Sequence, residues 1–185
     1  MSRKAPQAAG ILDKPLPRGR QEASLSAFAF LFSEMMQYSR DRSSEVPELE
    51  QKMRDLGVGV GQRVLELTCW REKNCQRELK VLQMLAFVTS TVWKTLVGKP
   101  ADDTQKADTE GEYYIVDNDP LVNRFISVPE DMGQFNCAEF MSGVVKGVLD
   151  SADFPAEVSS VLQEGKTFFI IKFDAAVVRR DMAMS

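Results

Sequence analysis

The chain has 185 residues, of which 44% are hydrophobic and 27% charged, a balance typical of a globular domain rather than of a disordered chain. Its net charge of −4 argues against a protein whose main partner is a nucleic acid. It contains no histidine, which excludes the usual general base, Ser-His and Cys-His catalytic pairs, histidine-ligated zinc and haem held by a proximal histidine. The composition therefore favours a binding or structural protein and predicts no catalytic site, metal or cofactor.

The first residues differ in composition from the rest of the chain. Residues 1–20 hold several prolines and glycines together with the basic side chains of Arg3, Lys4, Lys14, Arg18 and Arg20. We expect a flexible basic tail before a single domain over residues 21–185. Such a tail either contacts an anionic membrane surface or stays solvated without a role. No apolar run approaches the roughly 20 residues that span a bilayer, so any membrane contact is expected to be peripheral. The three cysteines and the lack of a secretory segment after Met1 predict a cytoplasmic chain with reduced thiols.

Residues 24–38 predict a helix with few charges. Leu25, Phe28 and Phe32 recur at three- and four-residue steps and define one apolar face. Other large apolar residues lie off this face, so the helix should be buried on more than one side. Either later parts of the chain or a second protein can cover the other side. The residues expected to form a partner interface are Leu25, Phe28, Leu31, Phe32, Met35 and Met36.

A glycine-rich stretch, GVGVG over residues 57–61, interrupts the next helical pattern. We expect a helix over residues 46–57, with Pro47 in its first turn and Gly57 at its end. A tight turn at Gly59 and Gly61 would then lead into a new helix over residues 60–73. A phosphate-binding loop is the weaker interpretation, because a dinucleotide site requires Gly-x-Gly-x-x-Gly directly after a strand.

Residues 77–97 give the clearest helical pattern of the chain. Apolar side chains recur at helical spacing from Val81 to Leu96, and Gly98 and Pro100 follow as a cap and a stop. We expect this helix to be central and buried. The following residues, 101–112, are acidic and rich in turn-forming types, and they predict a loop.

Four later segments are rich in β-branched and aromatic residues. YYIVD, residues 113–117, and RFISV, residues 124–128, are separated by the turn signal DNDP and predict one hairpin. Residues 155–163 and 167–173, separated by Glu164 and Gly165, predict a second antiparallel pair. The expected order of elements is α-α-α-α-β-β-α-β-β, which is an α+β fold with a small four-stranded antiparallel sheet.

The helix expected between the two hairpins begins at Asn136, a favourable N-cap, and carries Gly143 and Gly147. A glycine in a helix interior costs up to ~1 kcal/mol relative to alanine, so we interpret this pair as the place where a neighbouring backbone approaches. Cys137 lies at the start of the same helix, where a thiol can become a nucleophile. Without a histidine to activate it, a small buried side chain is favoured over the nucleophile of a cysteine-dependent transferase.

Three motifs occur in a characteristic order along the chain: Gly57-x-x-x-Gly61-x-Arg63, the run NDPLVNRFISVP, and the helix CAEFMSGVVKGVL. Together with the aromatic-rich first helix, they resemble the small core subunits of the transport protein particle, TRAPP, of the larger of its two small-subunit types. The resemblance covers about residues 22–182. It implies a small antiparallel sheet with four to five helices packed on one side. The positions typical of the family or of close packing are Gly57, Gly61, Arg63, Gly143 and Gly147.

The resemblance also implies a function and its partners. Members of the family pair with paralogous small subunits through their first helices, and the pairs assemble into a flat complex. That complex tethers vesicles in transport from the endoplasmic reticulum to the Golgi apparatus and promotes nucleotide exchange on a Rab GTPase. We therefore expect a non-catalytic structural subunit that forms a heterodimer and touches the Rab indirectly or weakly. It would be cytoplasmic and peripheral to cis-Golgi and endoplasmic reticulum membranes.

One paralogue in this family carries an acyl chain on a cysteine that follows the glycine-containing helix. Cys75 lies in a similar neighbourhood, but its spacing from that helix differs, so acylation of Cys75 is the less favoured interpretation. The alternative function is a small-ligand or acyl-binding module with an apolar pocket beneath the central helix.

Overall fold

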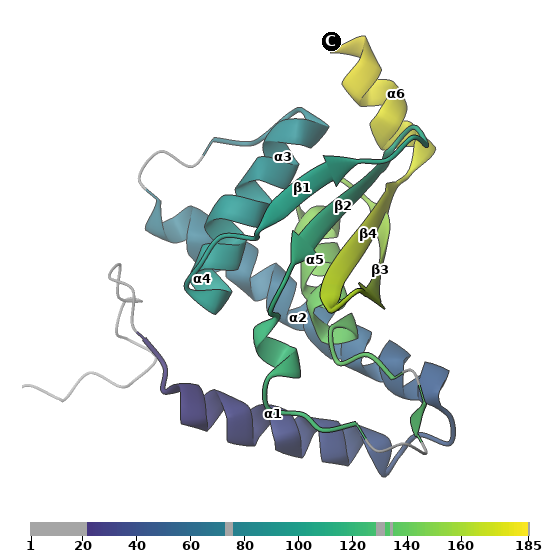
Figure 1. Ribbon diagram of the computed structural model, residues 1–185. Coiled ribbons are helices and arrows are strands. Elements are labelled where there is room, and N and C mark those ends of the chain that lie inside the picture. Colours follow the sequence, from purple (N-terminus) through teal and green to yellow (C-terminus); the bar gives the residue numbers. More distant parts are fainter. Residues whose placement is uncertain (1–21, 73–75, 129–131, 134, 185) are drawn as a thin grey trace, which may run out of the picture.

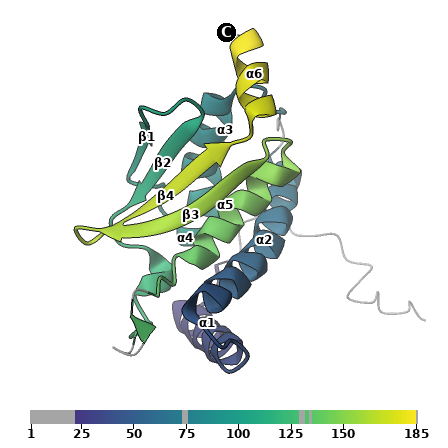
Figure 2. The same ribbon diagram turned by 90° about the vertical axis from the view of Figure 1, so that its right-hand side faces the viewer.

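The computed structural model describes residues 22–72, 76–128, 132–133 and 135–184, so the expected basic tail and Cys75 lie outside the described residues. One antiparallel sheet of four strands, in the order β1-β2-β4-β3, is covered by helices on one of its faces (Figure 1 and Figure 2). The α+β class expected from the sequence is confirmed.

The elements follow one another along the chain as alternating groups of helices and strands. The helices are α1 (Leu25–Arg40), α2 (Val46–Arg71), α3 (Val81–Phe87), α4 (Trp93–Val97), α5 (Glu139–Ser151) and α6 (Ala175–Ala183). A π-helical turn, η2 (Val88–Val92), joins α3 to α4, and a 3-10 turn, η3 (Leu121–Asn123), follows the second strand. The strands are β1 (Asp103–Lys106), β2 (Glu112–Asp117), β3 (Ala156–Gln163) and β4 (Lys166–Phe173).

The C-terminal hairpin of β3 and β4 forms as the sequence predicts. Phe169, Ile171 and Phe173 are buried in the core, and the residues between them along β4 are at least partly exposed. Glu164 and Gly165 connect the strands with φ angles of 52° and 76°, the left-handed pair that a tight hairpin turn requires. Alternation and turn residues are local signals, so this pairing can be read from the sequence.

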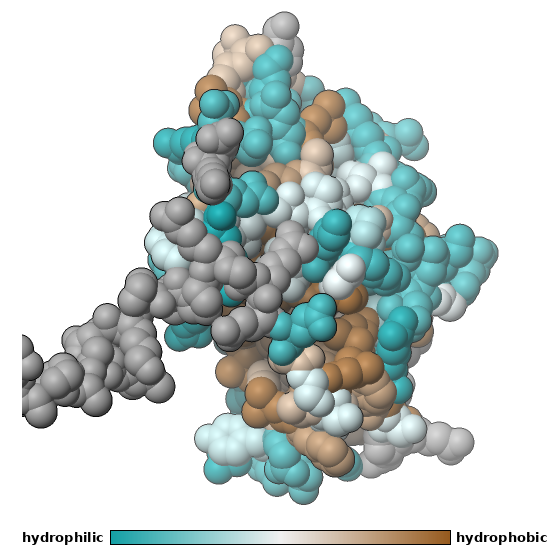
Figure 3. Space-filling view, turned by 90° about the vertical axis from the view of Figure 1, so that its left-hand side faces the viewer, coloured by the Kyte–Doolittle hydropathy of each residue, from teal (hydrophilic) through white to brown (hydrophobic). Residues whose placement is uncertain are grey.

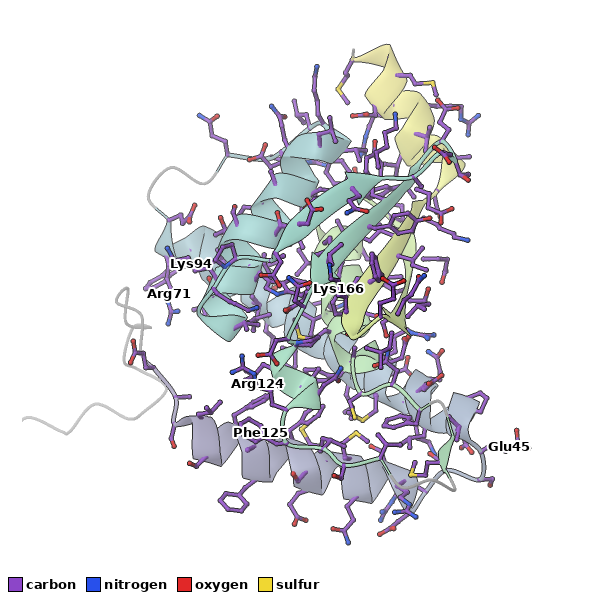
Figure 4. The ribbon with its side chains drawn as sticks, viewed as in Figure 1. Glu45, Arg71, Lys94, Arg124, Phe125 and Lys166 are labelled. Carbon is purple, nitrogen blue, oxygen red and sulfur yellow. The ribbon has the colours of Figure 1, made fainter. Side chains whose placement is uncertain are left out.

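The first predicted hairpin is wrong in its second strand. β2 pairs with β1 on one edge and with β4 on the other, so neither edge is free for residues 124–128. These residues instead leave the sheet after η3 and run along α1, where Figure 4 shows Arg124 and Phe125. β1 lies within residues 101–112, which were expected to be a loop because they are acidic and rich in turn-forming types. Its sequence, DTQK, is polar, and all four residues are exposed, so the strand has no alternating apolar pattern.

The helix break expected at the GVGVG stretch does not occur. α2 continues without interruption through this stretch, and Gly57 and Gly61 are buried inside it. The predicted helices over residues 46–57 and 60–73 are therefore one helix, and the predicted turn at Gly59 is wrong. The cause is the neighbour of α2 in the folded chain, the helix α5, whose backbone lies against Gly57 and Gly61.

Two features of the C-terminal part of the chain also differ from the prediction: the start of α5 and the presence of α6. α5 begins at Glu139, because residues 136–138 form a turn in which Asn136 Oδ1 accepts a 3.0 Å hydrogen bond from the N–H of Ala138. α6 was not predicted, since Val177 is its one buried residue. The Asp181 carboxylate of α6 accepts a 2.8 Å hydrogen bond from the N–H of Val81 and so satisfies a backbone donor at the start of α3.

The helical rod from α3 through η2 to α4 is the central buried element that the sequence predicts. Its Trp93 is 1% exposed and packs edge-on against Phe169 of β4 at a centroid distance of 5.2 Å. The Trp93 Nε1 donates a 3.1 Å hydrogen bond to the buried carboxylate of Asp117 in β2. Gly98 ends the rod with a φ angle of 87°, as expected for a C-terminal glycine cap. The rod therefore joins the helical layer to the sheet.

Candidate functional site

The glycines of α2 lie directly against the backbone of α5. An ideal Cβ atom on Gly57 would lie 2.1 Å from the carbonyl oxygen of Phe140. One on Gly61 would lie 2.2 Å from the carbonyl oxygen of Val144. No side chain fits at either position, and Figure 2 shows the two helices side by side. Both glycines are therefore needed inside an intact helix and do not form a turn.

The glycines of α5 are matched to α2 in the same way. A Cβ atom on Gly143 would lie 2.0 Å from the carbonyl oxygen of Arg54, and one on Gly147 would lie 2.3 Å from that of Val58. The sequence analysis predicted that a neighbouring backbone approaches Gly143 and Gly147. That backbone is the backbone of α2. Because both helices carry glycines at the crossing, their main chains touch directly, and these positions serve packing rather than ligand binding.

A buried ion pair connects the same two helices. The Glu139 side chain of α5 is 4% exposed, and its Oε2 accepts hydrogen bonds of 2.9 and 2.6 Å from Nε and Nη2 of Arg54. Its Oε1 accepts bonds of 2.7 and 2.9 Å from the backbone N–H and the hydroxyl of Ser160 in β3. A buried carboxylate requires such partners. The pair therefore holds α2, α5 and β3 in one arrangement.

Glu50 lies beside this ion pair, on α2. Its Oε1 accepts a 3.2 Å hydrogen bond from the backbone N–H of Asn136. Burial raises the pKa of Glu50, the hydrogen bond from Asn136 opposes that rise, and the negative charge of Glu139 adds to it. Glu50 is therefore a partly buried acid whose charged form is disfavoured in the folded chain.

The first helix is covered by the chain on one side. Phe32 and Met36 are 2% and 8% exposed, and the Phe32 ring packs edge-on against Phe140 of α5 at 5.4 Å. The expectation that these two side chains become buried by a partner protein is wrong, because the chain itself buries them. Phe28 and Met35 are partly buried at the border of this contact.

The other side of α1 exposes large apolar side chains next to α2. Leu31 and Tyr38 are 62% and 60% exposed on α1, and Leu56 of α2 is 43% exposed. We call these residues, together with Met35, the α1–α2 surface. Figure 3, which views the molecule from the left-hand side of Figure 1, shows that apolar side chains also gather over the lower part of that side. Contiguous apolar patches are uncommon on monomeric proteins and mark interaction sites.

Further exposed apolar residues lie elsewhere on α1. Leu25 is 50% exposed in the first turn, and Phe30 is 75% exposed on a different side of the helix from Leu31. The sequence analysis did not assign Phe30, Tyr38 or Leu56 to an interface. The spacing of apolar residues predicts that a helix is amphipathic, but it does not tell which apolar positions the same chain covers.

A groove of about 620 Å³ runs between α1 and α2 along the α1–α2 surface. Its lining combines the apolar side chains of Met35, Tyr38 and Leu56 with charged side chains of both signs: Glu34, Arg42, Lys52 and Asp55. The Arg42 guanidinium lies 3.6 Å from the centroid of the Tyr38 ring. An apolar centre with a polar rim is the usual anatomy of a protein–protein interface.

The remaining candidate residues give no sign of chemistry. Cys137 is 3% exposed, and burial raises the pKa of its thiol to about 12, so it lacks the thiolate that a nucleophile requires. Arg63 is exposed on α2 and donates to the carbonyl oxygen of Gly59 at 3.3 Å. Among the described residues, no group of three or more acids and cysteines is arranged to hold a metal ion. Within the same residues, no helix is long and apolar enough to cross a membrane.

A pocket of about 580 Å³ lies where α2 ends and α3 begins. Leu65, Met84 and Phe87 form its apolar wall, and the partly buried Cys69 lies among them. Its polar side includes Arg77, whose guanidinium contacts the carboxylate of Asp153 at 2.8 Å. Cys75, the residue considered for acylation, lies outside the described residues.

Comparison with known proteins places these features in a family. Residues 28–174 match the family model described as transport protein particle (TRAPP) component. A trafficking protein particle complex subunit 5 from Dictyostelium discoideum is 48% identical over 178 residues, covering 92% of this chain and 96% of that relative. The Homo sapiens protein of the same name is 45% identical over 175 residues, covering 94% and 93%.

A solved structure shares the fold at much lower identity. It is a trafficking protein particle complex subunit 3 from Naegleria fowleri, covalently bound to palmitic acid. The two structures superpose with a TM-score of 0.72 at 14% identity, over 81% of this chain and 95% of the other. At this identity the likeness supports the fold alone.

Proposed function

The chain belongs to the TRAPP component family, and from this premise we propose that it is a non-catalytic structural subunit of a vesicle-tethering TRAPP complex. Its relatives are named as subunits of the trafficking protein particle complex. The observation that carries the proposal is the α1–α2 surface, where Leu31, Tyr38 and Leu56 remain exposed beside an apolar groove. We propose that a paralogous small subunit covers this surface in a heterodimer.

The physical chemistry of the surface suits a partner helix. Complete burial of one large apolar side chain contributes ~1.5–3 kcal/mol. Association first costs roughly 4–15 kcal/mol of lost translational and rotational freedom, so several such side chains must be buried together. An apolar groove between two helices is the kind of surface on which an amphipathic helix docks. The charged side chains of Glu34, Arg42, Lys52 and Asp55 set the register and select the partner.

Co-purification with paralogous small subunits tests this proposal. Leu31→Asp places a charge at the α1–α2 surface and should abolish pairing while the chain stays folded. Leu162→Asp is the matched control, because Leu162 is 60% exposed at the end of β3, on the sheet. We expect this control to pair like the wild type. A wild-type chain that stays a monomer among its paralogues, or a Leu31→Asp chain that pairs normally, would overturn the proposal.

The proposal also includes the cellular location of the complex and the way in which this subunit contacts a Rab GTPase. We propose that the complex works at the cytoplasmic side of endoplasmic reticulum and cis-Golgi membranes, and that this subunit contacts the Rab GTPase through its neighbours. The basic side chains of residues 1–20 would add peripheral contact, at ~1 kcal/mol for each charge near an anionic surface. Liposome co-sedimentation of the complex with and without these residues, at low and moderate salt, measures this contribution. Equal binding by both forms would remove the tail from the proposal.

The pocket beside Cys69 favours a second candidate function, the binding of an acyl chain. Its apolar wall of Leu65, Met84 and Phe87 suits a hydrocarbon. The structure of similar fold from Naegleria fowleri is covalently bound to palmitic acid. Intact-mass measurement of the native chain, before and after hydroxylamine treatment, tests this function together with the variants Cys69→Ser and Cys75→Ser. A chain that carries no added lipid mass would exclude it.

A further inference from the structure

Beneath α1 the chain leaves an apolar cavity of about 290 Å³. Its wall includes Phe28, Phe32, Leu96, Leu121 and Met141, so α1, α4, η3 and α5 all contribute. The charged group in the wall, Asp117, is already bonded to Trp93 and Lys99. The volume is about twice the ~150 Å³ of an engineered apolar cavity that takes up benzene. Protein interiors contain few voids larger than a water molecule, so an apolar occupant is expected.

The chain enters α1 close to this cavity. Ser24 caps the helix with its hydroxyl toward the N–H of Ala27, and Phe28 of the cavity wall follows one turn later. Leu25 in the first turn is 50% exposed. Residues 1–21 lie outside the described residues and lead directly to this end of α1.

One segment among these preceding residues is apolar. GILDKPLP, residues 10–17, carries Ile11, Leu12 and Leu16 in a stretch that is otherwise basic and polar. Pro15 and Pro17 favour an extended backbone at and before their positions. In an extended chain, Leu12 and Leu16 point to the same side, because side chains alternate with a period of two residues.

The length of the chain allows this segment to reach the cavity. The stretch from Leu16 to Ser24 spans up to about 26–29 Å when extended. Met35, the wall residue of α1 farthest from the helix start, lies about 17 Å along the helix from Ser24. Leu12 lies four residues earlier in the chain than Leu16 and reaches farther still.

We propose that residues 10–17 fold back along α1 and place Leu12 and Leu16 in the cavity. The carboxylate of Asp119, next to the wall residue Pro120, is already paired with Arg124, so docking rests on the apolar side chains of the segment and on its reach. Leu31 and Met35 belong both to the wall of this cavity and to the α1–α2 surface, so docking is tested on the isolated chain, without a paralogous subunit.

Hydrogen–deuterium exchange and dye binding on the purified full-length chain test the proposal. The variant Leu12→Asp/Leu16→Asp adds two charges to the segment. The matched control Gln7→Asp/Ala9→Asp adds the same charges just before it. Neither variant changes a described residue, so both should keep a cooperative thermal transition, and the Leu12/Leu16 variant alone should melt at a lower temperature, because only it loses the apolar burial of the docked segment.

We expect exchange in peptides over residues 94–98 and 118–124, which line the cavity, to become at least about tenfold faster in the Leu12/Leu16 variant. This variant should also bind the apolar dye anilinonaphthalene sulfonate, whereas the wild type and the control should not. Equal exchange and equal dye binding in the two variants would overturn the proposal. A lipid mass or a co-purified protein in the wild type, together with equal exchange, would do the same and identify the true occupant.

Discussion

The crossing of α2 with α5 and the contact of α1 with the body show two opposite ways of placing a helix. At the crossing, glycines let the two main chains touch, and the ion pair of Arg54 with Glu139 is buried between them. α1 contacts the body through Phe32 and Met36, leaves Leu31 exposed, and has a cavity beneath it. The crossing therefore fixes the position of α2 against α5, whereas α1 keeps apolar side chains exposed that a partner protein can contact.

The comparison also explains why the two regions differ in composition. Glycine weakens an isolated helix by up to ~1 kcal/mol at each interior position, so it is retained where a side chain cannot fit. Exposed leucine and tyrosine cost little in the fold of the free chain, but they gain free energy when a partner buries them. Stability and binding should therefore respond separately to substitutions in the two regions.

The largest expected effect follows from Gly143→Leu at the crossing. Even a Cβ atom there would lie 2.0 Å from the carbonyl oxygen of Arg54. Overpacking costs ~1–3 kcal/mol where side chains can move aside. A helix backbone cannot move aside in this way, so we expect a larger loss of unfolding free energy, or no folded chain, in urea titrations.

Gly59→Ala is the matched control for this prediction, because the nearest atom to a Cβ at Gly59 is the Arg63 guanidinium nitrogen at 3.7 Å. Alanine should therefore stabilise α2 by up to ~1 kcal/mol. A Gly143→Leu chain that unfolds at the same urea concentration as the wild type would show that the two helices do not touch in this way.

Substitutions at two adjacent residues of α1 are expected to have effects of intermediate size. Phe32→Ala removes a ring that is 2% exposed and stacked 5.6 Å from the ring of Phe28, and should cost about 3–5 kcal/mol of unfolding free energy. Leu31→Ala removes a side chain that is 62% exposed, and should change the stability of the isolated chain by no more than about 0.5 kcal/mol. It should nevertheless weaken pairing with a paralogous subunit. Thermal melts combined with pull-down assays separate the two effects, and equal destabilisation by both variants would contradict the described position of α1.

The smallest expected effect is the pH dependence of Glu50 beside the crossing. Burial raises the pKa of Glu50 in the folded chain, so folding favours its protonated form. The resulting penalty is complete above the folded pKa and disappears as the pH falls below the unfolded pKa. Glu50→Gln should therefore stabilise the chain at neutral pH, by no more than about 0.5 kcal/mol because the group is partly exposed, and have no effect below about pH 4.

Glu48 provides a control of opposite sign. A hydrogen bond from the Lys52 ammonium is the main cause that lowers the pKa of Glu48 in the folded chain. Its charged form is favoured by folding, so Glu48→Gln should reduce stability at neutral pH, and the difference should be lost in acid. Melting temperatures measured against pH for both variants test the signs. An advantage of Glu50→Gln that grows as the pH falls would refute the assignment.

Local patterns in the sequence were enough to predict several parts of this protein. Alternation and the turn at Glu164 and Gly165 predicted the hairpin of β3 and β4, and helical periodicity ending at Gly98 predicted the central rod. The small residues of α5 indicated that a backbone approaches Gly143 and Gly147. All of these signals lie within a few consecutive residues, so they can be read without knowing which element lies opposite.

The tertiary structure decided what lies opposite each local pattern. By itself the GVGVG stretch favours a break, yet α2 stays intact because the backbone of α5 fits against Gly57 and Gly61. RFISV has the composition of a strand, but both edges of β2 are occupied. The apolar face that periodicity assigns to α1 includes Leu25, which is 50% exposed, and leaves out Met36, which is 8% exposed because the body covers it. The propensity of a residue depends on its own side chain, whereas its burial depends on which distant segment reaches it, and only the folded chain supplies that segment.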